Sequence, residues 1–412
     1  MHRGPGRDAR KVKSMNVSSM KVSSMKISDR IQIGVFFGGP SAEHEVSCAS
    51  AKAVVRGLPS DRYGLRVIGV TRRGRFVLLS EETVEQARSS RPGPVAIEDR
   101  LEIVGTPVEL LPDRDRRALR IVARDSPQVD LGRVDVAFPV MHGAYGEDGV
   151  FQGLLEAYGV RYVGCGVGAS AIGMDKVAMK RAFAAEGIPI APYRVITGGL
   201  WTSTRDKLSL VDGLLWPLYV KPARLGSSIG VSRVGVGRAG AGPRALTDAV
   251  ELALRYDTTV IVEQAVTGAR EFDCGVLTDP EGGVIMSLPA ELKVADELLD
   301  FRQKYVSQDV TLTVPADLPP PVFQQVRNLA AAAFGAIGGY GLARVDFLWD
   351  ERADQLFVCE INTMPGFTTR STFARAWEAS GLPYPRLLAA LIDHALLRPP
   401  RRDGQPWPEG HA

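Results

Sequence analysis

Cysteine is scarce in this sequence, and no two cysteines stand at a recognisable spacing. The chain has 412 residues but only four cysteines, which are Cys48, Cys165, Cys274 and Cys359. None of them forms a Cys-x-x-Cys motif, so neither a disulfide framework nor a structural zinc site is indicated. This usage favours a reducing compartment, and we expect a cytoplasmic protein.

Long apolar runs and an excess of one charge are also missing. No stretch approaches the roughly 20 apolar residues that a membrane-spanning helix needs, so no membrane partner is expected. Basic and acidic residues number 50 and 47, which gives a net charge of +3. That balance argues against a broad nucleic-acid-binding surface. The length suits about two to four domains of roughly 100–200 residues each.

The first 29 residues lack the apolar segment of a secretory signal. They are rich in Ser, Met and basic residues and contain the repeat SSMKVSSMKIS. A disordered tail, or sequence translated from upstream of the true start, is the favoured interpretation, and an amphipathic transit peptide is the alternative. Residues 1–29 and a Pro- and Arg-rich tail at 401–412 are therefore left out of the fold prediction.

What is present in the first part of the chain is an alternation of strand-like and helix-like segments. Strands are expected at 31–37, 66–71 and 134–140, and helices at 41–56 and 149–159. This order predicts an open α/β sheet, in which ligands bind at the carboxyl ends of the strands. Residues 80–130 are polar and charged, and they give no clear assignment.

Beyond residue 165 the character of the chain changes. Strands are expected at 218–223, 229–234, 259–266 and 271–277, and helices at 174–187, 242–256, 322–338 and 385–397. Two further strands at 342–349 and 355–362 predict a hairpin. Three domains are predicted, at 30–164, 165–260 and 261–400.

Polar side chains recur at alternate positions of the predicted hairpin. Arg344 and Asp346 share one face of its first strand, and Glu360 and Asn362 share one face of its second. A register centred near residue 353 would place Asp346 opposite Glu360, and Arg344 opposite Asn362. Asp, Glu and Asn oxygens suit Mg²⁺ bound together with phosphates, and arginine suits an anion. Ordinary surface salt bridges are the alternative, which the apolar neighbours argue against.

Two glycine-rich loops are further candidates for ligand contact. The first, RLGSSIG at 224–230, follows Lys221 and could present backbone N–H groups to phosphates, with a flexible hairpin as the alternative. No Gly-Lys-Ser/Thr follows, so this is not a Walker A loop. The second places His142 at a strand end, where ligand contact is common, although a single His, like Glu43 or His44, is more often structural. Neither a Ser-His-Asp arrangement nor an H-E-x-x-H motif is found.

Taken in order, eight motifs resemble those of the D-alanine–D-alanine ligases of the ATP-grasp superfamily. They are GGPSAEHEVS (38–47), HGAYGEDG (142–149), GMDK (173–176), VKPARLGSSIGVS (220–232), EFDCGVL (271–277), KY (304–305), ARVDF (343–347) and CEINTMPGFTTRS (359–371). Each is weak or moderate alone, but eight in the family's order and spacing are specific, and they span about 31 to 398. The resemblance implies a Rossmann-like α/β N-terminal domain followed by a two-domain, α+β ATP-grasp fold.

The resemblance also implies an ATP site between the last two domains. Lys176 and Lys221 would hold phosphates, and the 226–230 loop would close over them. Glu263 would meet the adenine amino group, and Glu271 the ribose. The set of nucleotide-binding residues implied in this way is Lys176, Lys221, Gly226, Ser227, Ser228, Glu263, Glu271 and Lys304.

Metal and amino-acid sites follow from the same resemblance. Asp346, Glu360 and Asn362 would bind two Mg²⁺ or Mn²⁺ ions. Glu43, with His142 nearby, would receive the ammonium of the first D-alanine, and Ser371 the carboxylate of the second. Ser227 and Tyr305 would bond with Glu43. The other catalytic groups implied are Lys304, in the mobile loop, and Arg344 and Gly366, which would meet the oxyanion.

The implied reaction is ATP-dependent joining of two D-alanines through a D-alanyl phosphate, for peptidoglycan precursors. The family is cytoplasmic and commonly homodimeric, and its substrates are small molecules. Lys304-Tyr305 is intact, which favours an amine as second substrate. Thr372, however, replaces the family's large apolar residue, so a relative with D-serine or another D-amino acid as second substrate is an alternative. An inactive nucleotide sensor is a further alternative, which the intact metal and oxyanion residues argue against.

Overall fold

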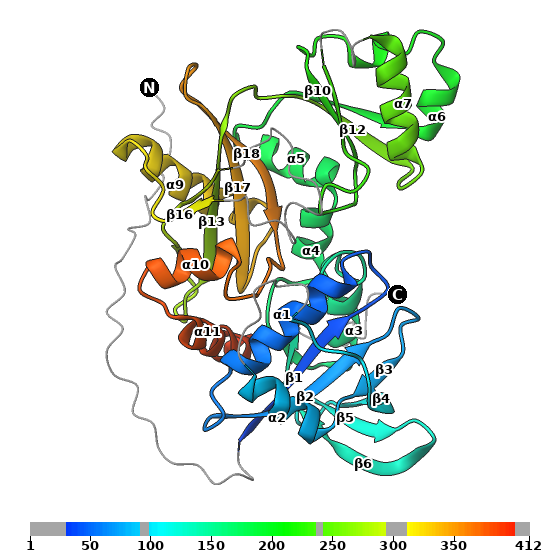
Figure 1. The fold of residues 1–412 in the computed structure, drawn as a ribbon, viewed down its shortest axis with the longest axis vertical. Coiled ribbons are helices and arrows are strands. Elements are labelled where there is room, and N and C mark those ends of the chain that lie inside the picture. The colour runs from blue at the N-terminus through cyan, green and yellow to red at the C-terminus, as the bar shows by residue number, and fades with distance from the viewer. Residues whose placement is uncertain (1–29, 91–98, 236–241, 294–310, 400–412) are drawn as a thin grey trace, which may run out of the picture.

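The structure is a computed structural model that describes residues 30–90, 99–235, 242–293 and 311–399. Residues 1–29, the Lys304-Tyr305 pair and the tail at 401–412, on which predictions were made, lie outside these ranges. The described residues form three sheets, each with helices packed on it (Figure 1). No helix in the described ranges combines the length and apolar character needed to cross a bilayer.

The first sheet has eight strands in the order β6-β5-β4-β3-β2-β1-β7-β8. Its elements are β1 (Ile31–Gly38), α1 (His44–Gly57), β2 (Tyr63–Val70), β3 (Phe76–Leu78), α2 (Glu81–Ser89), β4 (Thr106–Asp113), β5 (Ala118–Ala123), β6 (Ser126–Val134), β7 (Val136–Pro139), α3 (Val150–Tyr158) and β8 (Arg161–Tyr162). Strands β2, β1, β7 and β8 are parallel, and β3 to β6 extend the sheet as an antiparallel meander. The predicted open α/β sheet is thereby confirmed for the parallel half.

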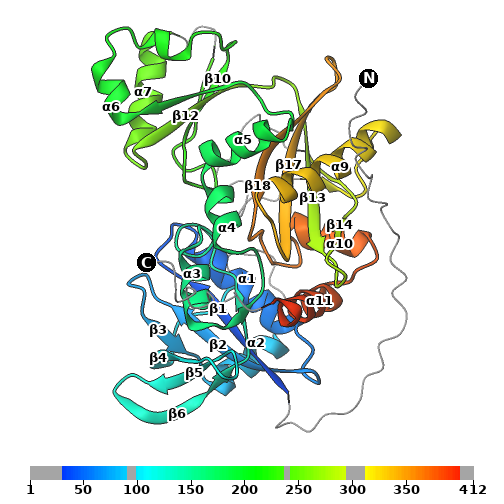
Figure 2. The same ribbon diagram turned by 180° about the vertical axis from the view of Figure 1, so that it is seen from behind.

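The parallel half is buried on both faces, which explains its continuous apolar sequence. The last six residues of β1, 33–38, are all buried. Helix α1 covers one face together with α11 (Tyr384–Leu397) from the far end of the chain, and the two helices lie side by side in both views (Figures 1 and 2). Leu388 and Ile392 of α11 share a core with Val35 and Phe37 of β1. The C-terminal helix thus completes the N-terminal core.

The second sheet has four strands in the order β11-β10-β12-β9 and lies at the far end of the molecule from the first (Figure 1). Its elements are β9 (Tyr193–Thr197), α6 (Gly198–Ser203), the 3-10 helix η2 (Leu208–Val211), β10 (Leu218–Pro222), β11 (Ser232–Val234), α7 (Pro243–Leu254) and β12 (Thr259–Gln264). Helix α7 buries Leu246, Ala249, Val250 and Ala253, a stripe of helical spacing that packs on β10.

The third sheet runs β16-β15-β13-β17-β18, with β14 paired to β13. Its elements are β13 (Arg270–Thr278), β14 (Val284–Met286), β15 (Ala290–Lys293), β16 (Thr311–Thr313), α9 (Pro320–Ala336), β17 (Leu342–Asp350), β18 (Gln355–Asn362) and α10 (Thr372–Ala379). Helix α9 covers one face with Val322, Val326, Ala330 and Ala333.

Helices α4 (Val167–Met174) and α5 (Lys176–Ala185) connect the first sheet to the other two. One helix was predicted over 174–187. In the structure α4 ends at Met174 and α5 begins at Lys176. Asp175 between them caps α5, because its carboxylate accepts hydrogen bonds from the N–H groups of Val177 and Ala178. The division into three domains at 164 and 260 stays a prediction.

Candidate active site

One cavity of about 1200 Å³ lies where loops of the first sheet meet strands of the second and third sheets. Every predicted site residue within the described ranges lines it. They are Glu43, His142, Lys176, Lys221, Gly226, Ser227, Ser228, Glu263, Glu271, Arg344, Asp346, Glu360, Asn362, Gly366, Ser371 and Thr372. Segments separated by more than 300 residues therefore contribute to a single site. Lys304 and Tyr305, the other two predicted residues, lie outside the described ranges.

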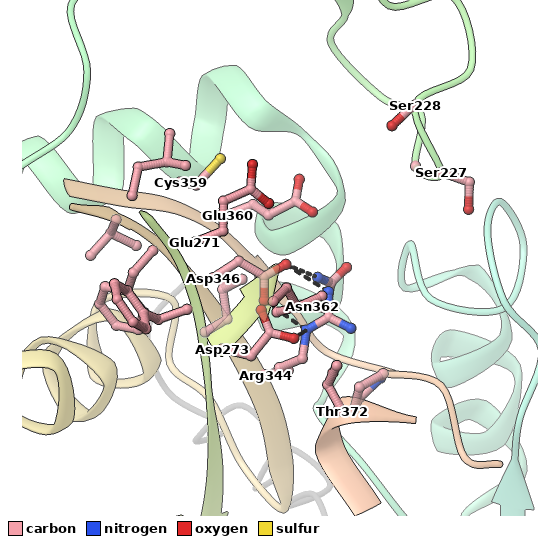
Figure 3. Close-up of a pocket in the computed structure, with 18 of the residues that line it drawn as sticks. Ser227, Ser228, Glu271, Asp273, Arg344, Asp346, Cys359, Glu360, Asn362 and Thr372 are labelled. Carbon is pink, nitrogen blue, oxygen red and sulfur yellow. Dashed lines mark hydrogen bonds and ion pairs between the residues drawn. The ribbon is translucent and has the colours of Figure 1, made fainter. Parts of the chain in front are cut away.

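A carboxylate cluster, formed by Asp273, Asp346 and Glu360 with Arg344 and Asn362, occupies the third sheet (Figure 3). The predicted hairpin register is confirmed, since Asp346 pairs with Glu360 and Arg344 with Asn362. A β-bulge shifts the pairing of β17 with β18 between Asp346 and Phe347. Asp273 comes from β13, where it pairs with Asp346. Alternate positions of EFDCGVL carry charge, a signal that could have identified Asp273 beside Glu271.

Arg344 is the cation at the centre of this cluster. Its Nε and Nη2 atoms donate to the two carboxylate oxygens of Asp346, both at 2.6 Å, and Nε lies 3.3 Å from Asp273 Oδ2. Asn362 Nδ2 donates to Asp346 Oδ2 at 3.2 Å. Burial raises the pKa of Asp346 well above its usual value, and although the Arg344 charge opposes this, Asp273 and Glu360 add to it.

The donor set of this cluster fits a divalent cation that arrives with a phosphate ligand. Three carboxyl groups surround one guanidinium, so another positive charge is electrostatically favoured. Within the described ranges, no group of three or more His, Cys, Asp or Glu side chains is arranged to hold a metal on its own. Asp346, Glu360 and the Asn362 amide would therefore share the ion with ligand oxygens, which is usual for Mg²⁺.

A lysine cluster, formed by Lys180, Lys221 and Glu263, lines another wall of the cavity. Lys221 of β10 donates from Nζ to Glu263 Oε2, and Lys180 Nζ of α5 lies 2.7 Å from Glu263 Oε1. Burial alone would raise the Glu263 pKa, but the two lysine charges outweigh it and hold the pKa at about 2. Lys180 was not predicted. Its position four residues after Lys176, on the same helix, is the signal that could have found it.

The glycine-serine loop lines the cavity and contacts the loop that follows β1. Ser227 Oγ donates to Glu43 Oε1, so the contact predicted between these residues is present. Ser227 and Ser228 both have positive φ angles, of 52° and 56°, which non-glycine residues rarely adopt. A Cβ atom on Gly226 would lie 3.3 Å from Glu43 Oε2, so a glycine is favoured there. Lys176 Nζ donates to the Leu225 carbonyl at 2.5 Å.

His142 and Glu147 lie at the base of the cavity. The His142 Nδ1 atom faces the Met364 carbonyl at 3.1 Å, so Nδ1 carries the proton, and Nε2 accepts from Ser50 Oγ at 2.8 Å. Burial lowers the His142 pKa to about 4, and the ring is neutral. Glu147, which was not singled out from the sequence, accepts from the Gly143 N–H at 3.0 Å. Burial, with the Glu43 charge, raises the Glu147 pKa well above its usual value.

Ser371 and Thr372 stand at the start of α10, and Thr372 lies near Arg344 (Figure 3). Ser371 Oγ caps this helix by accepting from the Ala374 N–H at 3.4 Å, and it donates to the Thr368 carbonyl at 2.7 Å. The Thr372 hydroxyl is buried and has no hydrogen-bond partner within the described residues.

Comparisons with known proteins give one consistent answer. Residues 32–165 match the family model described as the D-ala D-ala ligase N-terminus, and residues 182–393 match the C-terminus. D-alanine–D-alanine ligases of Kineococcus radiotolerans and Mycolicibacterium smegmatis are each 44% identical to this chain. The alignments cover 89% and 90% of this chain, and 97% and 96% of those proteins.

Solved structures of two ligases resemble this chain. The VanG D-Ala:D-Ser ligase of Enterococcus faecalis is 29% identical, with a TM-score of 0.73, over 89% of this chain and 100% of that one. The D-alanine-D-alanine ligase of Coxiella burnetii is 32% identical, with a TM-score of 0.72, over 89% of this chain and 94% of that one.

Proposed function

Since the chain belongs to the D-alanine–D-alanine ligase family, we propose that it joins two D-alanine molecules into D-alanyl-D-alanine, using ATP and a divalent cation. The observation that carries this proposal is that every predicted site residue in the described ranges lines the same cavity. The product would serve peptidoglycan precursor synthesis in the cytoplasm. The substrates are small molecules.

The nucleotide would lie between the second and third sheets. Lys176 and Lys221 would hold its phosphates, beneath the loop that carries Ser227 and Ser228. Glu263 would accept from the adenine amino group, and Glu271 would contact the ribose. The surplus positive charge of the lysine cluster supports this assignment, because two ammonium groups share one carboxylate. Lys304, which lies outside the described ranges, would reach the phosphates in the same way.

Asp346, Glu360 and Asn362 would hold the divalent cation, Mg²⁺ or Mn²⁺. We propose that two such ions bind at this site. When bound, the cation neutralises charge on the transferring phosphoryl group. The protein's part in this step is to position the carboxylate of the first D-alanine. His142, which lines the same cavity, is neutral and buried, so it does not compete for the Glu43 charge, and Glu43 would receive the substrate ammonium. The carboxylate of the first D-alanine would attack the γ-phosphorus, giving a D-alanyl phosphate and ADP.

The second amine would then attack the acyl carbon and expel phosphate. Arg344 and the Gly366 N–H would stabilise the oxyanion that forms. Hydrogen bonds to Asp346 occupy the Arg344 Nε and Nη2 atoms, while Nη1 has no such bond in the described part of the chain. Ser371 would bind the second carboxylate. Tyr305, outside the described ranges, would bond with Glu43 beside Ser227 and exclude water from the acyl phosphate.

D-Alanine is the favoured second substrate because the relatives at 44% identity are named D-alanine–D-alanine ligases. The likeness to a protein named a D-Ala:D-Ser ligase is weaker, at 29% identity. An inactive nucleotide sensor is not favoured either, because the Arg344 and Asp346 pair is built into the cavity. The three-domain division and a homodimer remain further parts of the proposal, the latter testable by light scattering.

The test is to incubate the purified protein with ATP, Mg²⁺ and single or paired amino acids. Phosphate release and dipeptide formation are followed together. We expect ADP, phosphate and D-alanyl-D-alanine with D-alanine as the only amino acid. Turnover only when D-serine or another partner accompanies D-alanine would replace the proposed second substrate. ATP binding without turnover on any pair would favour the nucleotide sensor instead.

A further inference from the structure

Two lysines contact one buried carboxylate, but they differ in how deeply they are buried. The Lys180 side chain is 2% exposed, Lys221 is 17% exposed, and Glu263 between them is 7% exposed. Lys180 comes from α5, Lys221 from β10 and Glu263 from β12, so three elements fix the cluster. All three side chains line the cavity, and Lys221 is the more accessible cation for an incoming anion.

The two carboxylate oxygens of Glu263 also differ. Lys221 donates a hydrogen bond to Oε2. Lys180 Nζ lies 2.7 Å from Oε1, but this contact is an ion pair that is not aligned as a hydrogen bond. Buried Oε1 therefore has no hydrogen-bond donor in the described residues.

We propose that Lys180 is a positioning residue, the fixed counter-ion that keeps Glu263 ionised when the nucleotide phosphates draw Lys221 away. This inference rests on the proposed function, in which Lys221 binds phosphate and Glu263 meets the adenine amino group. Lys221 has one ammonium group and cannot hold both partners at full strength. Without Lys180, its transfer would leave a buried carboxylate with no cation, and such a group takes up a proton instead.

The groups around Glu263 leave Lys180 as its remaining partner. Lys180 Nζ lies 5.8 Å from the centre of the Tyr193 ring on β9, and Lys221 Nζ 5.6 Å from that of Tyr219 on β10. From β18 the cluster faces Cys359, whose pKa burial raises to about 12, so the thiol is neutral. Glu360 on the same strand adds negative charge near Lys221. Hence, among the described residues, Lys180 is the ion-pair partner that Glu263 keeps after Lys221 has moved.

The test compares Lys180→Met with Lys180→Arg, which keeps the charge, and with Arg181→Met, which removes an exposed cation from the next position of α5. The KM for ATP and kcat are measured with Mg²⁺ and saturating D-alanine, and Mg-ATP binding is measured by calorimetry. We expect Lys180→Met to raise the KM and the Kd for ATP by roughly tenfold, with kcat within about threefold of wild type. Lys180→Arg should recover much of the affinity, and Arg181→Met should stay within about twofold.

The pH profile separates this role from a merely structural one. In Lys180→Met, binding ATP would require Glu263 to take up a proton, so affinity should weaken as the pH rises. The ratio of variant to wild-type Kd for ATP should therefore grow between about pH 6.5 and about pH 8.5. In Lys180→Met/Glu263→Gln, which has no carboxylate to protonate, that growth should disappear. The double variant also serves if the single variant fails to fold.

Three results would overturn the inference. The first is a folded Lys180→Met with wild-type affinity at every pH, and the second is a loss confined to kcat. The third is an undiminished pH-dependent ratio in the double variant, which would show that Glu263 is not the titrating group. A wild type that binds Mg-ATP but forms no dipeptide would refute the proposed function alone, since the calorimetric ratios still test Lys180. A wild type that binds no Mg-ATP would refute both.

Discussion

The lysine cluster and the carboxylate cluster face the same cavity and carry opposite surplus charge. On one wall, two ammonium groups share the Glu263 carboxylate, whose pKa is held at about 2. On the other, three carboxyl groups surround Arg344, and the Asp346 pKa is raised well above its usual value. Each cluster is therefore electrostatically incomplete. A nucleoside triphosphate with its metal ion would supply negative charge to the lysine cluster and positive charge to the carboxylate cluster.

The largest effect is expected on the carboxylate wall. Asp346→Asn keeps the shape of the side chain but removes a charged oxygen ligand and half of the Arg344 ion pair. We expect kcat to fall by roughly 10²–10⁴-fold, because charge on the transferring phosphate is no longer neutralised. Glu360→Gln should act in the same direction. Dipeptide formation measures the loss, and circular dichroism checks the fold.

Asp350→Asn is the matched control for that loss. Asp350 is on the same strand, four residues along, and does not line the cavity. Its Oδ1 atom accepts from the N–H groups of Arg352 and Ala353, and an Asn oxygen can do the same. Near-normal turnover in Asp346→Asn would remove Asp346 from the metal site, and an equal loss in Asp350→Asn would point to damage of the sheet.

The next effect is expected on the lysine wall. Lys221→Met should raise the KM for ATP by roughly 10–100-fold, since a charge-assisted hydrogen bond to phosphate is lost. Glu263 keeps Lys180 as its partner, so the fold should survive. Arg224→Met is the matched control, because it removes a cation three residues along that pairs with Asp257 and does not line the cavity. Equal KM values for ATP in wild type and Lys221→Met would contradict the role of Lys221 in binding phosphate, and with it the contrast between the two clusters.

The carboxylate wall could be predicted from sequence more completely than the lysine wall. Alternation on two strands joined by a short turn fixes which side chains meet, so Asp346 and Glu360 were paired correctly before the fold was known. Lys180 reaches Glu263 only through the packing of α5 beside β12, across 83 residues of chain. The four-residue spacing from Lys176 places Lys180 on the same side of the helix but does not identify Glu263 as its partner. Likewise, alternation places Asp273 beside Glu271 on one face of β13, but not opposite Asp346.

The same limit applies to the fold. Residues 31–37 were assigned as a strand from their short apolar run, and such a run is typical of a parallel strand that is buried on both faces. Strands β4 and β6, in contrast, expose most of their residues, so the region at 80–130 carried no clear pattern. Their place in the sheet follows from pairing with neighbours rather than from their own composition.

A smaller effect is expected on stability. Glu263→Gln leaves two buried lysines without their carboxylate, and we expect a loss of about 3 kcal/mol in the free energy of unfolding at neutral pH. Because the Glu263 pKa is lowered on folding, its contribution is present above its ordinary value of 4.5 and is lost as the pH falls toward about 2. Urea unfolding at several pH values measures this.

The stability difference between wild type and Glu263→Gln should shrink steadily below about pH 4.5, because wild-type Glu263 also becomes neutral in that range. A difference that stays constant down to the acid limit would mean that the charge of Glu263 contributes little to stability. A difference that grows on acidification would contradict the sign of the pKa shift itself.

The smallest effect is expected at Thr372, which belongs to neither cluster. Its buried hydroxyl has no hydrogen-bond partner in the described residues, so Thr372→Val, which keeps the shape, should change stability by less than about 1 kcal/mol. If that hydroxyl faces the second amino acid, Thr372→Val and Thr372→Met should raise the preference for D-alanine over D-serine by about 10-fold or less, because a polar partner for the serine hydroxyl is lost. Thr372→Ser, which keeps the hydroxyl, is the control. The KM for ATP should stay within about twofold in all three, because neither charged wall is altered. An unchanged ratio of the two dipeptides would show that Thr372 does not influence the choice of second substrate. A large rise in the KM for ATP would show that a change at Thr372 also affects the charged clusters that bind the nucleotide and its metal ion.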